Sequence, residues 1–529
     1  MIAQTLPFIQ IPGMSEYSNK DKAFTLEPDS LERDQRAHSL GPKSAEVIQE
    51  TMSDVICSSL QQSHLKALAS GKASVIVTGQ QPGFLGGPLY SLYKAMTCIA
   101  IAKSQSTNDH QVIPVFWIED NDHDGMEAGI ATIIDAKGNL HSIECEDKQL
   151  LQSKLSISER VFSEDIIRII NDITSLLPDS EFGQTIAKEV QSIHRPGISW
   201  SSAFLSFMQK RCGEYGVLFF SSAIARKHGL FADAMIHELM NPGNLKTYVD
   251  RANDDIRKEG KQIQSEAGEI NAFFHDANGQ RIKVEYVADD LYRIGEQSFG
   301  KEELAQFFSV HTLQFSPSVL LRPLIQDAIL PSVGMIVGPG EARYMSQLRY
   351  AYPAYSIPMP ALHSRHSVTI LSHSIGKYLA KHGLSSHEFF KTMNEIEQDL
   401  SSRFAQDISG EELFISLSDH IHNAMHEIAL HANTIDPSLQ GAVSATEHGI
   451  EKQLDQLSKK MKSGIKKKQD QLFVKAQEAH DWIYPHNHLQ ERVLSAVSIE
   501  AKVGSDGLRG ILNEIQQSAC DEHLIFLPD

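Results

Sequence analysis

The chain has 529 residues, of which 41% are hydrophobic and 22% charged, a composition typical of a large globular protein with more than one domain. Its net charge of −19 argues against nucleic acid and anionic membranes as partners, because binding phosphate groups requires a basic surface. No basic leader precedes an apolar run at the start, and no run of about 18 apolar residues occurs, so we predict no secretion signal and no membrane-spanning helix.

Short β-rich segments alternate with helical patterns in the N-terminal part of the chain. Ser74–Gly79 (SVIVTG) predicts a buried strand, a helix is expected from about Pro88, and Gln111–Glu119 (QVIPVFWIE) predicts a second strand. Gly129–Asp135 and Gly216–Ser222 predict two more. Strands that alternate with helices indicate βαβ units, so we expect an α/β fold with a mostly parallel sheet.

Two segments interrupt this alternation. Residues 150–215 combine helical patterns with irregular polar sequence. Residues 260–310 contain RIKVEYVADDLYRIGEQSFGKEEL, which predicts a small hairpin followed by a helix. The strand pattern returns in PSVLLRPLIQDAILPSVGMIVGPGEARYMSQL. We therefore assign residues 1–374 to a core domain with insertions near 150–215 and 260–310.

From about Ile375 the apolar residues recur at helical spacing. Two stripes share the spacing 4, 3, 4, 4: Phe389, Met393, Ile396, Leu400, Phe404, and Ile450, Leu454, Leu457, Met461, Ile465. Narrow stripes on polar helices predict an α-helical coiled-coil domain over residues 375–484. A helical hairpin would bury only part of each stripe, so we expect the remainder to form a homodimer. Residues 485–529 are expected to return to the core.

The five cysteines are far apart, odd in number and without a CxxC pair. This usage fits reduced thiols in the cytoplasm better than a disulfide framework or a zinc site.

A glycine-rich loop follows the first predicted strand, in VTGQQPGFLGGPLYSLYKA. It matches neither GxxxxGK[ST] nor GxGxxG. If Pro88 occupies the first helical position, the free amides at the helix start would suit a carboxylate or phosphate. The alternative is a tight turn that only connects strand and helix. Two adjacent glutamines at the strand end favour a binding site, formed by Gly79, Gln80, Gln81, Gly86 and Gly87.

The acidic stretch EDNDHDGME (Glu119–Glu127) follows the second predicted strand. It begins like an EF-hand loop, but Ala131 stands where that loop requires a glutamate, which argues against calcium. The loop has three other interpretations: a metal site, a solvated acidic turn, or acid–base chemistry. We favour acid–base chemistry by His123, with the carboxylates of Asp122 and Asp124 raising its pKa and fixing its ring.

Positive charge gathers between Pro317 and Ile370, which contains four arginines, no lysine and two acids. Arginines near a strand–glycine–helix turn (IVGPGEARY) suit a carboxylate or phosphate, although structural ion pairs are the alternative for each arginine singly. From this segment we take six further candidate substrate-binding residues: Arg322, Gly338, Glu341, Arg343, Tyr344, Arg365, together with the neighbouring His366.

Four motifs occur in order: VTGQQPGFLGGPLYSLYKA, PVFWIEDNDHD, LLRPLIQDAILPSVGMIVGPGEARYMSQL and HLQERVLS. Together they resemble the cysteine-adding enzymes of bacillithiol biosynthesis, the BshC family. The resemblance covers nearly the whole chain. It implies a Rossmann-like core with connecting-peptide insertions and a coiled-coil domain used in dimerisation. The loop EDNDHDGMEA is more acidic than is usual in the family.

The resemblance also implies an activity, the joining of L-cysteine to the amine of glucosaminyl-malate by a ligase. Adenine nucleotide (ATP or ADP) is associated with the family, but no motif here identifies a nucleotide site or a metal. Two other functions stay open: another carboxylate-activating or nucleotidyl-transferring enzyme with an anionic substrate, and a non-enzymatic scaffold. The polar strand ends argue against the scaffold.

Overall fold

The computed structural model describes residues 1–14, 30–145, 155–405 and 411–527. The chain forms two compact units, of which the first contains residues 1–376 and 488–529 and the second contains residues 377–487. In the part of the chain that is described, no helix is both long and apolar enough to cross a membrane.

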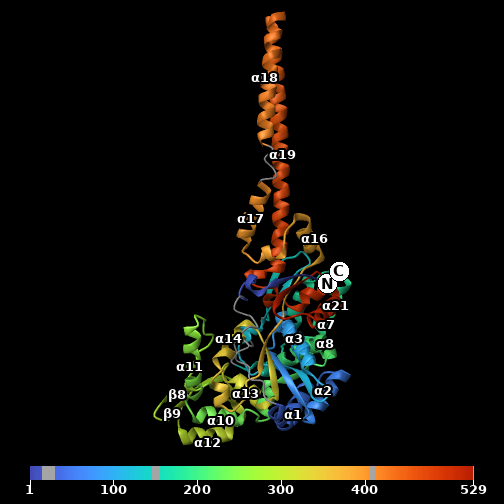
Figure 1. Ribbon diagram of the computed structural model, residues 1–529. Helices are drawn as coiled ribbons and strands as arrows, with labels where there is room; N and C mark the ends of the chain where they lie inside the picture. The colour runs from blue at the N-terminus through green and yellow to red at the C-terminus, as the bar shows by residue number, and fades with distance from the viewer. Residues whose placement is uncertain (15–29, 146–154, 406–410, 528–529) are drawn as a thin grey trace. The chain divides into compact units, whose positions relative to one another are not determined.

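A five-stranded sheet lies at the centre of the first unit (Figure 1). All its neighbouring strands are parallel, in the order β13 (Ala361–Ser364), β12 (Ser332–Val337), β2 (Ala73–Gln80), β3 (Gln111–Ile118) and β6 (Leu218–Ser221). The predicted α/β class with a Rossmann-like parallel sheet is confirmed. One predicted strand lies elsewhere, because β4 (Ile130–Ile134) pairs antiparallel with β5 (Leu140–Glu144) in a separate small sheet.

Strands β2 and β3 are buried along almost their whole length, which explains why both read as continuous apolar runs. Helix α3 (Tyr90–Gln105) packs on β2, β3 and β12, and helix α1 (Ser30–Thr51) packs on β2 and β6. Helix α3 begins two residues after Pro88, which instead forms a β-bridge with Ser495.

Helices from many parts of the chain surround this sheet. Residues 155–215 supply three of them, and the remaining helices of the unit connect or cover strands. Their bounds are α2 (Ser59–Ala69), α4 (Gly125–Ala128), α6 (Asp165–Leu176), α7 (Glu181–Ile193), α8 (Trp200–Cys212), α9 (Ser222–Lys227), α10 (Ala232–Met240), α11 (Asn244–Lys258), α13 (Arg322–Ile329), α14 (Pro339–Gln347), α15 (Ala351–Ala354), α20 (Gln490–Val493) and α21 (Ala496–Ile515).

The second interruption forms an antiparallel sheet of its own. Its order is β10 (Gln297–Gly300), β9 (Leu291–Ile294), β8 (Arg281–Ala288), β7 (Ala272–His275) and β11 (Phe315–Pro317). The predicted hairpin is β8–β9, and the predicted helix is α12 (Lys301–His311). Sequence reasoning found the hairpin but not the three other strands.

Residues 488–529 complete the first unit. Strand β15 (Glu522–Phe526) lies between β1 (Ile2–Pro7), which is antiparallel to it, and β14 (Ser367–Ile370), which is parallel. The fully buried carboxylate of Glu491 accepts hydrogen bonds from Arg365 Nη2 at 2.6 Å, Ser367 Oγ at 3.0 Å and Val368 N at 2.7 Å. Burial opposes its ionisation most strongly, but the charge and hydrogen bond of Arg365, together with His523 and the amide of Val368, outweigh burial and lower the pKa of Glu491.

The second unit consists mainly of helices, and the predicted coiled coil is confirmed. Helices α18 (Glu411–Ile435) and α19 (Gln440–Ile483) run side by side as an antiparallel hairpin (Figure 1). The unit also contains α17 (Met393–Ala405) and most of α16 (His373–His382), and α17 packs on α19.

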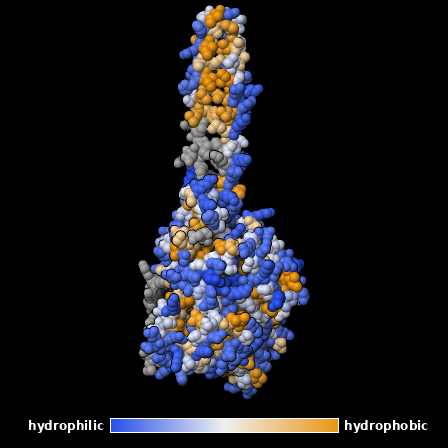
Figure 2. Space-filling view, turned by 90° about the vertical axis from the view of Figure 1, so that its right-hand side faces the viewer, coloured by the Kyte–Doolittle hydropathy of each residue, from blue (hydrophilic) through white to orange (hydrophobic). Residues whose placement is uncertain are grey.

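The two predicted apolar stripes have different environments in this unit. Phe389, Ile396 and Leu400 are buried, whereas Leu457 and Met461 are 50% and 45% exposed. Figure 2 shows hydrophobic residues gathered along the hairpin. The side chains of Phe404 and Ile465 lie outside the described residues. The apolar surface of the hairpin is therefore only partly covered within one chain.

Replacing Glu491 by alanine is expected to lower the free energy of unfolding of the first unit by about 3–5 kcal/mol, because Arg365 would remain buried without its partner. Of the three tryptophans, Trp117 and Trp200 lie in this unit, so a Trp482→Phe background makes urea unfolding by fluorescence report on it alone. The matched control, Glu285→Ala, breaks an exposed pair with Arg293 and should cost no more than about 1 kcal/mol. Equal effects of both variants would contradict the prediction.

Candidate functional site

A cavity of about 510 Å³ lies at the carboxyl ends of the central strands, where ligands bind in open α/β sheets. The ends of β2 and β3, the turn after β12 and helix α14 form one part of its wall. The insertion sheet and the segment before α13 form another, through Phe273, Arg281, Pro317, Ser318 and Val319. One residue of α20, Arg492, also lines it.

Nine of the fifteen predicted site residues line this cavity: Gly79, Gln80, Gln81, Asp122, Arg322, Gly338, Glu341, Tyr344 and Arg365. They come from three separate segments of the chain, which the parallel sheet brings to one edge. The other six do not line it: Gly86, Gly87, His123, Asp124, Arg343 and His366.

The second half of the glycine loop is packed inside the protein. A Cβ at Gly86 would lie 2.2 Å from ring atoms of Phe207, and φ is positive at both Gly86 and Gly87. The amide of Leu89 bonds to Leu494 O at 2.9 Å, and the amide of Ser91 bonds to Pro88 O. Gly86 and Gly87 therefore form a tight turn against α8, which was the alternative interpretation of this loop.

Of the three candidate residues in the acidic stretch, only Asp122 lines the cavity, together with Glu119 at the start of the stretch. Gln81 Nε2 donates to Asp122, and Arg281 Nη1 donates to it at 3.1 Å. His123 is 39% exposed, and its Nδ1 lies 3.4 Å from Asp122 and 3.3 Å from Arg281. Asp124 is exposed. The expected flanking of His123 by two carboxylates is replaced by one carboxylate and one arginine.

Arg343 and His366 lie away from the cavity for different reasons. Glu341 and Tyr344 are three residues apart on α14 and share a face, whereas Arg343 is turned about 100° from Tyr344. His366 is buried, with Nδ1 2.8 Å from Thr97 Oγ1 and Nε2 3.0 Å from Ser518 O. Burial lowers its pKa, so His366 is a neutral core residue.

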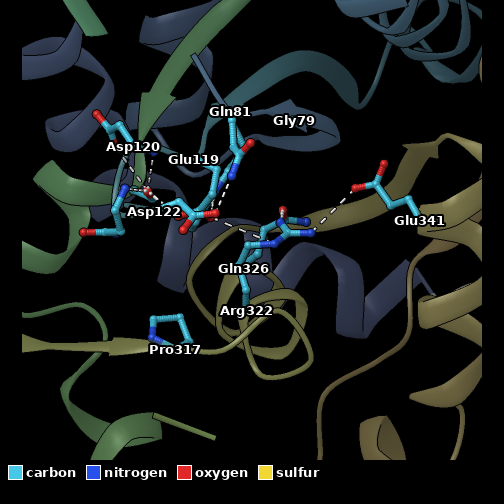
Figure 3. A network of polar contacts seen from close by, with 12 residues as sticks. Gly79, Gln81, Glu119, Asp120, Asp122, Pro317, Arg322, Gln326 and Glu341 are labelled. Carbon is cyan, nitrogen blue, oxygen red and sulfur yellow. Dashed lines mark hydrogen bonds and ion pairs between the residues drawn. The ribbon is translucent and has the colours of Figure 1, made fainter. Parts of the chain in front are cut away.

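Charges of alternating sign run along the cavity wall (Figure 3). The ammonium of Lys94 donates to Glu341 Oε2 at 2.8 Å and to Gly79 O at 2.7 Å. Glu341 Oε1 lies 3.6 Å from Arg322 Nη2, and Arg322 Nε lies 3.9 Å from Glu119 Oε2. This network joins β2, β3, α13 and α14.

The pKa values of the three carboxylates of the wall shift in different directions. For Asp122 and Glu341, burial opposes ionisation, but their cationic and hydrogen-bonding partners outweigh it and lower both pKa values. For Glu119 burial prevails and raises the pKa, despite the charge of Arg322. Burial also lowers the pKa of Lys94.

The family model for the N-terminal Rossmann-like domain of the bacillithiol biosynthesis protein BshC matches residues 14–366, and the model for its C-terminal coiled-coil domain matches residues 368–527. The chain belongs to the BshC family. Proteins named "Putative cysteine ligase BshC" are 28% identical to it in Chlorobaculum tepidum (88% of this chain, 85% of that protein) and in Chlorobium phaeobacteroides (87% and 84%). A relative of the same name in Salinibacter ruber is 25% identical over 82% of this chain and 80% of its own.

Among solved structures, a chain titled "putative arginyl t-RNA synthetase" from Campylobacter jejuni aligns over 90% of this BshC-family chain and 98% of its own. Its identity is 10% and its TM-score is 0.23, values too low to support any argument.

Five ionisable lining residues were missed by the sequence reasoning: Tyr90, Lys94, Glu119, Arg281 and Arg492. Lys94 and Glu119 lie inside the motifs VTGQQPGFLGGPLYSLYKA and PVFWIEDNDHD, and Arg492 lies in HLQERVLS, so the motifs themselves were a signal. No sequence signal pointed to Arg281, because its position beside the cavity depends on how the insertion sheet packs.

The lining suits an anionic ligand in general. It contains five cations, Lys94, Arg281, Arg322, Arg365 and Arg492, and three acids, so 5 − 3 gives +2 in a chain of net charge −19. Arg492 is exposed, and its guanidinium has no hydrogen bond or ion pair with any of the described residues. Across the described residues, no group of three or more His, Cys, Asp and Glu is arranged to hold a metal ion.

Proposed function

We propose that this protein is a ligase that joins the carboxyl group of L-cysteine to the amine of glucosaminyl-malate, the final step of bacillithiol biosynthesis. The observation that carries the proposal is the match of both family models, which together span residues 14–527. The names of the relatives describe a cysteine ligase and support the same reaction.

The charges of the cavity support this pair of substrates. Glucosaminyl-malate carries two carboxylates and one amine, and the lining offers arginines for the former and carboxylates for the latter. A cavity that holds both substrates converts a reaction between two molecules into one within a single complex. The role proposed for the residues at the strand ends is to hold the amine beside the cysteine carboxyl.

The proposal includes an adenine nucleotide as the source of the energy for amide formation. Among the lining cations, Arg492 is best able to meet a carboxylate of the substrate, because Lys94, Arg281, Arg322 and Arg365 are already bonded to protein oxygens. The lining has no feature that is specific for adenine.

The cytoplasm is the proposed compartment. All five cysteines are among the described residues and none forms a disulfide, as expected for a reducing environment.

Loss of this protein is expected to abolish bacillithiol and to cause glucosaminyl-malate to accumulate, because the acceptor would no longer be consumed. Thiol labelling followed by mass spectrometry of a deletion strain measures both compounds, and reintroduction of the gene is the control. Normal bacillithiol in the deletion strain would refute the proposed function.

Arg492→Ala is expected to weaken binding of glucosaminyl-malate about tenfold or more, because a charged hydrogen bond to a carboxylate contributes roughly 1.5–3 kcal/mol. Arg343→Ala is the matched control, since Arg343 lies near the site on α14 but does not line the cavity. Titration calorimetry on both folded variants makes the comparison. Equal affinities of the two variants would show that Arg492 does not contact the substrate.

A homodimer formed through the α18–α19 hairpin is the proposed assembly. Large apolar residues remain exposed on this hairpin, including Leu413, Leu417, Ile428, Leu457 and Met461. A second copy would cover such a surface, and two-fold pairing is the commonest arrangement of identical chains.

Replacing Leu457 and Met461 by aspartate should shift the protein from dimer to monomer, because each unpaired charge in a buried interface costs several kcal/mol. The matched control places the same two charges at Gln456 and Ser463, which are exposed and lie away from the apolar stripe. Sedimentation equilibrium at micromolar concentration measures the mass. A parent protein that is monomeric would contradict the proposed assembly.

A further inference from the structure

Three carboxylates line the cavity, and two of them are already saturated by protein donors. Asp122 accepts hydrogen bonds from Gln81, from Arg281 and from the amide of His123. Glu341 accepts from Lys94 and from Tyr344 OH, and it also faces Arg322. Both therefore remain carboxylates at neutral pH.

Glu119 is held less completely. Its backbone amide donates to Gln80 O at 3.0 Å, which fixes it at the end of β3. Oε2 accepts a hydrogen bond from Trp117 Nε1 at 2.8 Å, and Arg322 is distant at 3.9 Å. Oε1 lies 3.0 Å from Ser222 Oγ. No direct hydrogen bond from a cation is recorded for Glu119 in the described chain.

The hydroxyl group of Ser222 lies within hydrogen-bond distance of two carboxylates but has only one hydrogen to donate. Its Oγ lies 3.0 Å from Glu119 Oε1 and 3.1 Å from Asp120 Oδ1. The same Oγ accepts hydrogen bonds from the backbone amides of Asp120 and Asn121. A hydroxyl group donates only one hydrogen bond, so one of the two carboxylates lacks a donor there. A proton added to the pair would relieve this deficit.

Glu119 is the member of this pair that a ligand can reach. It lines the cavity, whereas Asp120 is 2% exposed and bonds to Ser221 Oγ and the amide of Ala223. Burial raises the pKa of both carboxyl groups, which agrees with their sharing the single hydrogen of the Ser222 hydroxyl group. A proton that leaves a bound substrate therefore meets Glu119 first.

We propose that Glu119 is the proton acceptor of the ligase, taking a proton from the attacking amine as the amide bond forms. The inference rests on the function proposed above. The amine nitrogen forms a bond to the carbonyl carbon of a cysteinyl mixed anhydride. The bond from that carbon to its phosphate leaving group breaks, the leaving group takes the electron pair, and the nitrogen gives its proton to Glu119 Oε1.

This assignment differs from the expectation for His123, and paired variants separate the two. Variants Glu119→Gln, Glu119→Asp, His123→Ala and the exposed control Glu285→Gln are each expressed in the deletion strain. The measured quantity is the initial rate of labelled bacillithiol formation after a pulse of isotopic cysteine. Glu119→Gln should lower the rate at least about 100-fold, as loss of a general base does, and Glu119→Asp should restore part of it. His123→Ala should lower the rate less than Glu119→Gln does, and the exposed control Glu285→Gln should remain close to the parent.

A second measurement tests whether Glu119 has a merely structural role. An acid whose pKa is raised by folding stabilises the protein below its unfolded pKa and loses that contribution as pH rises through its folded pKa. Glu119→Gln should therefore raise the melting temperature at pH 8, and the gain should vanish near pH 4. Calorimetry should find glucosaminyl-malate bound within a few-fold of the parent.

The outcomes separate the two proposals. If the parent gene fails to restore bacillithiol, the proposed function itself is wrong. If it restores bacillithiol and Glu119→Gln does so equally, only the role of Glu119 is wrong. A Glu119→Gln variant that is less stable than the parent at pH 8, or that no longer binds substrate, would make Glu119 a structural or binding residue and would overturn the inference.

Discussion

The buried ion pair between Lys94 and Glu341 holds the site together. Lys94 extends from α3 to the carbonyl of Gly79 at the end of β2, while Glu341 belongs to the first turn of α14 after β12. One contact thus fixes the ends of two neighbouring strands and two helices. Removing Glu341 would leave the ammonium of Lys94 buried without an anionic partner, which proteins rarely tolerate. The positions of Arg322, Tyr344 and, through Arg322, Glu119 depend on this pair.

A chain of net charge −19 concentrates cations around this one cavity, and most of them are held by acids of the protein itself. This arrangement keeps the arginines oriented before a ligand arrives, so that little reorganisation is needed on binding. It also explains why the local excess in the lining is only +2. Recognition then depends on geometry and on the few groups that lack a full set of partners.

The sequence was informative where chemistry follows directly from position along a strand. Gln80 ends β2, Gln81 follows it, and Asp122 lies four residues after the end of β3, and parallel strands place their ends at one edge. It was misleading at Gly86, where packing against Phe207 demands glycine, and at Gly87, where the positive φ favours it. For His123 the sequence showed a titratable ring in an acidic loop but not which way that loop faces, so its catalytic role stays a prediction. Arg281 was beyond reach, because no local pattern shows how an inserted sheet packs on its neighbour.

The order of synthesis sets a limit on when this site can exist. Residues 488–529 provide Glu491, Arg492 and β15, yet the ribosome makes them only after the whole of residues 377–487. At bacterial elongation rates that delay is on the order of ten seconds. During it, β1 and β14 lack the strand that joins them and Arg365 lacks its acid. Until residues 488–529 have been made, the nascent core therefore exposes unpaired strand edges. Such edges promote wrong association between chains.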